Sequence, residues 1–335
     1  MDCKRLSVLL IAAIMMITAL VACGQTEAAD PSATAPATAS PITTSETTTQ
    51  PEQTTATEAT DSEADSVQAV TNVPEVRQRP TDTWNGYSLV PIYDNGMEYV
   101  WSLLSDNVKD NVAVMMNAMS NEQDRCNLVH PVSESEIWEF VHFVHDHLCG
   151  YTHVDFYNYG YWDDGNGNVI ALQFVYLDNY GEAKAKNKEL QKKIDEIVAS
   201  APDTSERERI KYFHDYVVKN CTYSYDGRNG TSYGALIDGK AVCQGYAHAI
   251  QMLLSRAGFD AVPAIGSVEG GYHKWNYVKL SSGEWYVIDA TWDDPIGTPE
   301  GVVATYNYFM ITDEQLEKDH SRRYGSRYFT MPEAK

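Results

Sequence analysis

The chain has 335 residues, of which 47 are Asp or Glu and 25 are Lys or Arg, so its formal net charge is −22. This acidic balance excludes nucleic acid as the expected partner and disfavours electrostatic binding to anionic lipid, because like charges repel. Hydrophobic residues make up 43% of the chain, enough for a large core once the N-terminal segments are set aside.

Residues 1–22 have the pattern of an export signal. Lys4 and Arg5 form a basic start, and residues 6–20 form an apolar run too short to span a bilayer comfortably. The run ends in LVACG, which resembles the signal of a bacterial lipoprotein. The resemblance implies cleavage before Cys23, lipidation of that cysteine, and a place outside the cytoplasm on the cell membrane. An ordinary signal peptide or an uncleaved anchor is the alternative.

Residues 23–82 consist mostly of Thr, Ala, Ser, Pro, Glu and Gln. So few apolar side chains cannot offset the conformational entropy lost on folding, and we predict a disordered tether. A coil of about 60 residues spans about 40–45 Å on average and about 200 Å when pulled straight. This length suits a segment that holds a domain off a membrane.

Residues 83–201 are predicted to form a smaller α+β region. Its elements are predicted from apolar periodicity, with helices at 97–119, 133–148 and 181–201 and strands at 151–161 and 168–177. Ser133 and the Glu residues after it favour a helix start there. DDGNG, at residues 163–167, is a polar hairpin turn between the two strands.

Two stretches of this region carry several metal-ligand residue types. In FVHFVHDHLC, His142 and His147 lie roughly 140° apart around a helix, so one ion cannot bind both. His142 and His145 are close enough to pair, but no third ligand is specified. We therefore favour buried core histidines. DDGNGN lacks the acid spacing of a calcium loop, so no metal and no cofactor is expected.

Residues 202–335 start with a helix from Pro202 to about Asn220 and continue to a helix that begins at Cys243. Apolar residues mark the buried face of the second helix: Ala247, Ile250, Leu253 and Leu254. Gly258 stands where a C-terminal capping glycine belongs.

Cys243 lies at the N-terminus of its helix, where unpaired N–H groups and the helix dipole lower the pKa of a thiol. Its own backbone N–H is a candidate donor to an oxyanion. Gly245 keeps the first turn thin enough for a substrate to approach. The alternative is a small buried hydrophobe, which is what we expect of Cys221. Cys126 and Cys149 are left as one candidate disulfide pair.

A hairpin about 30 residues later supplies a base and an acid. SSG at residues 281–283 predicts a three-residue loop with its glycine in the left-handed conformation, which pairs Leu280 with Glu284. This register places His273 diagonal to Asp289 on one face, within hydrogen-bonding reach. His273 would exchange a proton with the thiol, and Asp289 would orient the imidazole. The alternative is a purely structural His–Asp pair.

Three separated blocks, SYGALIDGKAVCQGYAHAIQMLL, YHKWNYVKL and GEWYVIDATWDDP, resemble the bacterial transglutaminase-like superfamily, and YNYFMITDEQLEKDH resembles the end of its domains. The likeness covers about residues 202–320. It implies a papain-like α+β fold in which the nucleophile helix packs on an antiparallel sheet. It also implies that Cys243 is the nucleophile, His273 the base and Asp289 the orienting acid.

The resemblance leaves the reaction open between hydrolysis and amine transfer. Active members attack an amide carbonyl and form a thioester, so we expect peptide or isopeptide amides of surface or cell-wall proteins or peptides as substrates. A non-catalytic binding module on the same fold is the competing interpretation. Tyr233, Gln244, Trp275 and Trp292 are candidates for lining the cleft or binding the oxyanion.

Overall fold

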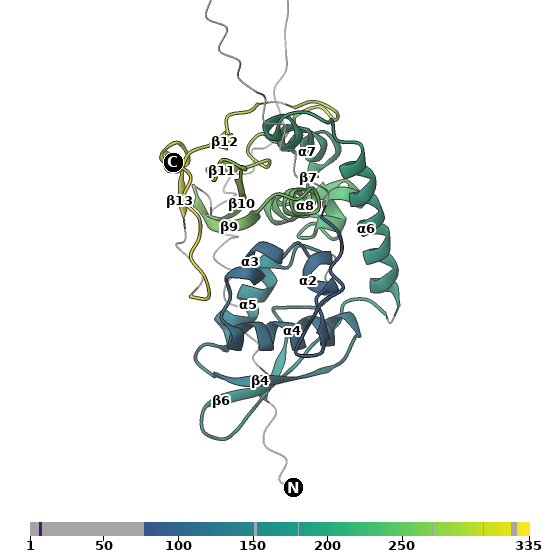
Figure 1. Ribbon diagram of the computed structural model, residues 1–335, viewed down its shortest axis with the longest axis vertical. Helices are drawn as coiled ribbons and strands as arrows, with labels where there is room; N and C mark the ends of the chain where they lie inside the picture. The colour runs from purple at the N-terminus through teal and green to yellow at the C-terminus, as the bar shows by residue number, and fades with distance from the viewer. Residues whose placement is uncertain are drawn as a thin grey trace, which may run out of the picture. The chain divides into compact units, whose positions relative to one another are not determined.

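The computed structural model describes residues 7–8, 77–150, 153–179, 181–269, 271–303, 305–322 and 327–335 (Figure 1). These residues belong to one compact unit, formed by Met1–Ala22 and Thr71–Lys335. The other unit, Cys23–Val70, lies outside the described residues, as do the predicted lipidation site and almost all of the signal segment and tether. Within the described ranges, every helix is too short or too polar to span a bilayer.

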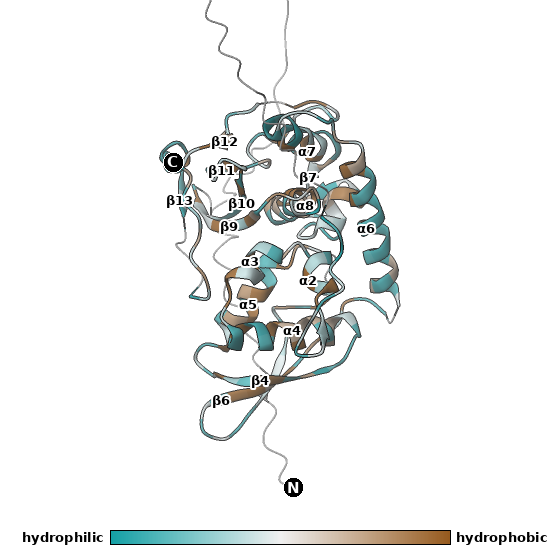
Figure 2. Cartoon of the chain, in the orientation of Figure 1, coloured by the Kyte–Doolittle hydropathy of each residue, from teal (hydrophilic) through white to brown (hydrophobic). Residues whose placement is uncertain are grey.

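The region before residue 202 combines helices with an antiparallel sheet. Its elements are β2 (Thr83–Trp84), β3 (Tyr87–Ser88), α2 (Val90–Asp94), α3 (Glu98–Leu103), α4 (Asp106–Ser120), β4 (Arg125–Ser133), α5 (Ile137–His147), β5 (Gly160–Asp163), β6 (Asn168–Gln173) and α6 (Glu182–Ala199). The sheet has the order β1-β5-β6-β4, with β1 at Ser7–Val8. Figure 2 shows β6 as largely hydrophobic and α6 as largely hydrophilic, as expected of a covered strand and a surface helix.

The structure corrects two of the predicted helices. The pattern at 97–119 is divided between α3 and α4, because Leu104 and Ser105 take extended backbone with ψ of 148° and 157°. Ser133 does not begin a helix, because it is the last residue of β4, and α5 begins at Ile137. Strand β4 itself was not predicted.

The predicted turn between β5 and β6 is confirmed. Asp163 Oδ1 accepts the N–H of Gly165 at 2.7 Å, and Asp164 Oδ1 accepts the N–H of Asn166 at 2.7 Å. Both carboxylates therefore stabilise the turn itself. Of the strand predicted at 151–161, the end pairs in the sheet as part of β5, and Val154 forms a separate antiparallel bridge with Tyr176.

The region from residue 202 contains α7 (Glu206–Asn220), β7 (Thr222–Tyr223), the π-helix η1 (Gly234–Asp238), β8 (Lys240–Ala241), α8 (Cys243–Arg256), β9 (Ala261–Val268), β10 (Gly271–Lys279), β11 (Trp285–Ile288), β12 (Phe309–Ile311), α9 (Asp313–Leu316) and β13 (His320–Arg322). Five strands form an antiparallel sheet in the order β12-β11-β10-β9-β13. Helix α8 packs on this sheet, where Asn276 of β10 donates to the Ala247 carbonyl at 3.0 Å (Figure 1). The predicted fold class is confirmed.

Helix α8 ends as predicted. Gly258 has a φ of +94°, and its N–H donates to the Ser255 carbonyl at 3.0 Å. The Phe259 N–H donates to the Leu254 carbonyl at 3.0 Å, which completes the paired bonds of a left-handed glycine cap. The four predicted apolar positions are buried: Ala247, Ile250, Leu253 and Leu254.

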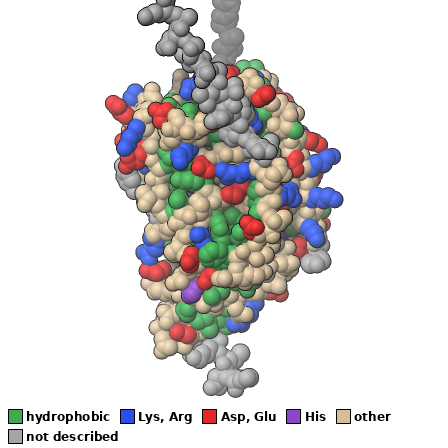
Figure 3. Space-filling model, in the orientation of Figure 1, with side chains coloured by type: hydrophobic (Ala, Val, Ile, Leu, Met, Phe, Trp, Pro, Cys, Tyr) green, Lys and Arg blue, Asp and Glu red, His purple; other side chains and the backbone are tan. Residues whose placement is uncertain are grey.

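Two hydrophobic clusters form the core of the described unit. One joins side chains of the N-terminal region, such as Met97 and Phe140, to Val262 and Trp275 of the five-stranded sheet. The other surrounds α8 and includes side chains of α6 and α7. On the surface, Figure 3 shows charged side chains of both signs scattered over one face, with hydrophobic side chains gathered near its middle. The N-terminal region therefore shares a core with the sheet that carries the candidate site.

Candidate active site

Cys243 differs from the other described cysteines in its exposure. It is partly exposed, whereas Cys126, Cys149 and Cys221 are buried, and all four are free thiols. The candidate disulfide is therefore not formed, and Cys221 is a buried thiol as predicted. Burial raises the pKa of Cys126 and Cys221 to about 12, which keeps both protonated at neutral pH. Cys243 is thus the thiol that reactants can reach.

The backbone around Cys243 is held by its neighbours on both sides. Val242 takes extended backbone before α8, and its N–H donates to the Asn229 carbonyl at 2.9 Å. A Cβ on Gly245 would lie 2.5 Å from that same carbonyl oxygen. Gly245 therefore makes room for a loop of the chain itself, and the predicted space for a substrate at this point is filled.

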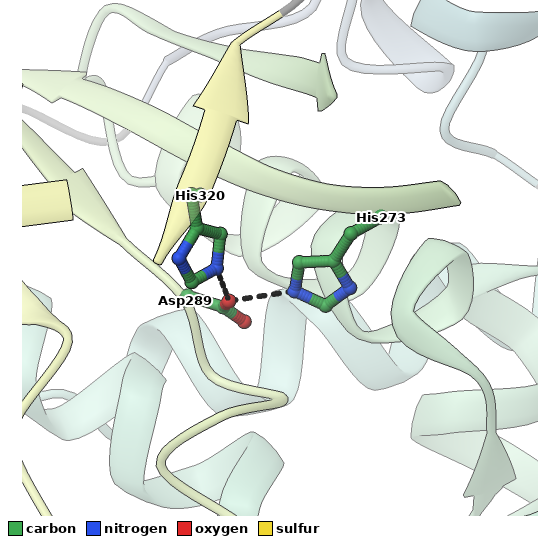
Figure 4. A group of neighbouring side chains, drawn as sticks. All are labelled: His273, Asp289 and His320. Carbon is green, nitrogen blue, oxygen red and sulfur yellow. Dashed lines mark hydrogen bonds and ion pairs between the residues drawn. The ribbon is translucent and has the colours of Figure 1, made fainter. Parts of the chain in front are cut away.

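The β10–β11 hairpin has the predicted register. The Leu280 N–H donates to the Glu284 carbonyl at 2.9 Å, and Gly283 has a φ of +92°. Nε2 of His273 lies 2.7 Å from Oδ2 of Asp289 (Figure 4). The structure therefore brings this predicted pair together.

The pair is ionised across the neutral range. Burial opposes the charge on His273, but Asp289 and Cys243 together outweigh burial and raise the pKa of His273 to about 10. Burial also opposes ionisation of Asp289, yet His273 and His320 lower the pKa of Asp289 to about 2. Nε2 is bonded to Asp289, which leaves Nδ1 for the Cys243 thiol with which the imidazole interacts. An imidazolium so placed stabilises a thiolate.

His320 is a further member of the site that sequence reasoning missed. Its Nε2 lies 3.1 Å from the same Oδ2 of Asp289, and its Nδ1 lies 2.6 Å from Asp319 (Figure 4). It lies on β13, the edge strand that pairs with β9, whereas β11 lies on the other side of β10. Its position therefore depends on the strand order. The one feature of the sequence that could have indicated His320 is that it ends YNYFMITDEQLEKDH, the last block that resembles the family.

Asp289 accepts hydrogen bonds at both oxygens. Oδ2 bonds the two imidazoles, and Oδ1 accepts the N–H groups of Thr291 at 3.0 Å and Trp292 at 3.2 Å. Ligand atoms of His273, Asp289 and His320 lie within 4.8 Å of one another, a spacing that a metal ion can also use. In this structure those atoms bond to one another.

Two of the predicted cleft residues lie beside these histidines. The half-buried ring of Trp292 lies 5.9 Å from His273 and 4.3 Å from His320. Trp275 is 1% exposed and packs 6.0 Å from His273, so it supports the site from within and does not line an open cleft.

The other two predicted residues point to the surrounding helices. The Tyr233 hydroxyl donates to Glu189 of α6 at 2.7 Å. Nε2 of the Gln244 amide lies 3.1 Å from Nε2 of His145 in α5. Both side chains are therefore bonded to neighbouring helices and not directed at an oxyanion.

The histidines of α5 are buried, as the core interpretation predicted. His142 and His145 are each 8% exposed and His147 is 5% exposed. Burial, with the charge of Lys274, lowers the pKa of His147 to about 3, so this imidazole is neutral. Across the described ranges, these histidines do not meet in a three-ligand metal cluster.

Another buried histidine, His214, supports the turn that follows Asp289. His214 of α7 has Nδ1 3.1 Å from Asp215 and Nε2 3.1 Å from Asp293. Burial opposes its charge, but the two carboxylates raise the pKa of His214. The other oxygen of Asp293 accepts the Thr305 hydroxyl at 2.7 Å. This network ties α7 to the turn that carries the candidate acid.

Residues 191–290 match the core domain of the Transglutaminase-like superfamily. The match contains Cys243, His273 and Asp289. No curated protein matches the sequence significantly.

Several solved structures are similar to part of the chain. One is a TGase, with 19% identity and a TM-score of 0.30 over 42% of this chain and 45% of that one. Another is a proposed cysteine protease from Cytophaga hutchinsonii, with 15% identity and a TM-score of 0.28 over 37% of this chain and 51% of that one. A third is the periplasmic domain of TgpA from Pseudomonas aeruginosa bound to ethylmercury, with 13% identity and a TM-score of 0.26 over 38% of this chain and 60% of that one. The chain thus covers 45–60% of the length of these proteins. The family match identifies residues 191–290 as a transglutaminase-like domain.

Proposed function

We propose that this protein is a thiol enzyme that attacks a peptide or isopeptide amide and forms a thioester on Cys243. The observation that carries the proposal is the hydrogen-bonded His273–Asp289 pair, 2.7 Å apart, which interacts with a partly exposed thiol at a helix N-terminus. A structural His–Asp pair has no need of a reachable thiol beside it.

The proposed roles are these. The Cys243 thiolate adds to the carbonyl carbon, and the carbonyl π electrons move to the oxygen. When the C–N bond breaks, His273 gives its proton to the leaving amine, and the thioester remains. Water or a second amine then attacks the thioester, loses a proton to His273 and releases Cys243. Asp289 holds the imidazole and stabilises its positive charge throughout.

The cellular setting is proposed from the sequence. Lipidation at Cys23 and a tether over residues 23–82 would hold an N-terminal α+β region (83–201) and the catalytic domain (202–335) outside the cytoplasm. The substrate would be a surface or cell-wall protein or peptide, and the acidic charge argues against nucleic acid.

Mass spectrometry of the purified protein and its Cys243→Ala variant tests the function. Each is incubated with mixed peptides, wall peptides and a primary amine. Cys243-dependent amine adducts indicate transfer, and Cys243-dependent deamidation or cleavage indicates hydrolysis. If wild type and variant give identical products while Cys243 shows the reactivity of an ordinary thiol, the binding-module interpretation replaces this one.

A further inference from the structure

The proposed chemistry calls for a second donor to the oxyanion. The backbone N–H of Cys243 is one donor, and Tyr233 and Gln244 are bonded elsewhere. An acyl transfer needs donors aimed at the oxygen on which charge develops. A tyrosine that interacts with the Cys243 backbone is Tyr223.

Strand pairing fixes the backbone of Tyr223 next to the nucleophile. β7 pairs in parallel with β8, and Tyr223 lies opposite Ala241, just before Cys243. The Ser224 N–H donates to the Ala241 carbonyl at 2.9 Å and extends this ladder. The position of Tyr223 is therefore set by the same strand that leads into α8.

The ring of Tyr223 packs over the first turn of α8. Its centroid lies 6.4 Å from that of Tyr246 in this turn, and Tyr225 meets it edge to face at 5.7 Å. The Tyr223 side chain interacts with the backbone of Cys243, and its hydroxyl interacts with that of Tyr225. The hydroxyl thus lies near the backbone of the candidate nucleophile.

We propose that the Tyr223 hydroxyl is the second oxyanion donor, and that it fills the oxyanion hole when no substrate is present. A carbonyl oxygen that enters takes over the Cys243 N–H and accepts the Tyr223 hydroxyl as well. A cavity of about 40 Å³, lined in part by Tyr223 and Pro295, adjoins this strand. The inference rests on the proposed function of Cys243.

An aldehyde tests the inference without knowledge of the natural substrate. The Cys243 thiolate adds to the carbonyl carbon of N-acetylglycinal, and the carbonyl oxygen takes the charge and then a proton from His273. Alkylation by iodoacetamide forms an S–C bond and expels iodide, so it produces no oxyanion. Protection of Cys243 from alkylation, followed by intact-protein mass spectrometry, therefore measures affinity for the aldehyde.

We expect Tyr223→Phe to weaken protection by the aldehyde at least about 10-fold, since loss of one oxyanion donor lowers rates by about 10²–10³. The alkylation rate without aldehyde should stay close to that of wild type. Tyr286→Phe, the same change on β11, should match wild type in both measurements. Tyr225→Phe, which keeps the Tyr223 hydroxyl and the ring contact but removes the hydroxyl that interacts with it, should retain most of the protection.

The outcomes separate the two proposals. Equal aldehyde protection of wild type and Tyr223→Phe overturns the role of Tyr223 and leaves the proposed function intact. Equal loss in Tyr223→Phe and Tyr225→Phe shows that the interaction between the two hydroxyls is responsible and not donation by Tyr223 to the oxyanion, which also overturns it. A wild-type Cys243 that is alkylated no faster than free cysteine and gains no protection overturns both proposals.

Discussion

The amide nitrogen of Gln244 lies 3.1 Å from Nε2 of His145, so the residue after the nucleophile bonds to a helix of the N-terminal region. A second polar contact lies nearby, where Lys274 of β10 donates to the Asp146 carbonyl at 3.1 Å. Helix α5 therefore contacts both elements that carry the candidate nucleophile and base. The N-terminal region therefore supports the candidate site, although this helix lies outside residues 191–290, which match the family.

A double-mutant cycle tests this support. Gln244→Ala leaves the buried Nε2 of His145 without this partner, and an unmade buried hydrogen bond costs about 1–3 kcal/mol. His145→Ala removes the other partner of the same bond. We expect urea unfolding to give a coupling free energy of about 0.5 kcal/mol or more between the two changes. Additive losses would show that the contact contributes nothing to stability.

Asp289→Asn should disable the site while the fold persists. An amide can still accept the N–H groups of Thr291 and Trp292, but it carries no charge to hold the His273 imidazolium. We expect Cys243-dependent turnover to fall about 10³–10⁴-fold. Alkylation of Cys243 at neutral pH should slow as well, because the imidazolium no longer favours the thiolate.

Asp319→Asn is the matched control for that change. Asp319 bonds the Nδ1 of His320 and so lies one histidine further from the thiol. Its effect on turnover should be much the smaller of the two. Equal losses in both variants would indicate a general disturbance of the histidine cluster instead of a specific role for Asp289.

Stability should depend on pH through the same pair. The pKa of His273 is raised to about 10, so its contribution to the free energy of unfolding is complete below about pH 6.5 and is lost as the pH rises toward 10. The pKa of Asp289 is lowered to about 2, so its contribution is lost only as the pH falls from about 4 toward 2. Urea unfolding near pH 5.5 and pH 9 should show a larger loss for wild type than for Asp289→Asn. The same loss in both proteins contradicts the assignment.

His214→Gln should destabilise the protein through the turn after Asp289. Loss of a partner from a buried charged pair costs about 3–5 kcal/mol, and Asp293 is fully buried. His130→Gln is the control, since His130 pairs with Asp110 at 2.7 Å but its side chain is 37% exposed, and such pairs contribute about 0–1 kcal/mol. Denaturant unfolding distinguishes the two, and similar losses would argue against the buried network.

Gly245→Ala tests how tightly the loop holds the nucleophile. Its Cβ would lie 2.5 Å from the Asn229 carbonyl oxygen, so the loop or the first turn of α8 must move. Gly230→Ala in the same loop places a Cβ at an ordinary 3.7 Å from Gln244. We expect Gly245→Ala to lower both stability and Cys243 alkylation, with an overpacking cost of about 1–3 kcal/mol, and Gly230→Ala to change little.

Local signals predicted what local geometry determines. The glycine at 283 set the hairpin register and so the His273–Asp289 pair, and Gly258 marked the end of α8. The break at Leu104 and the strand that ends at Ser133 were missed, because apolar spacing alone does not show where a helix gives way to extended backbone. His320 and Tyr223 depend on which strands lie side by side, and pairing between distant segments leaves no periodic trace in either one.

The order of the site residues along the chain means that the candidate site is completed late in synthesis. Cys243 and His273 are synthesised before His320, whose strand β13 pairs with β9 and whose imidazole bonds to Asp289. A nascent chain that has emerged only as far as the hairpin has the thiol and the base but lacks one of the groups that hold the acid. Full reactivity would then arise only once β13 has been synthesised and has paired with β9.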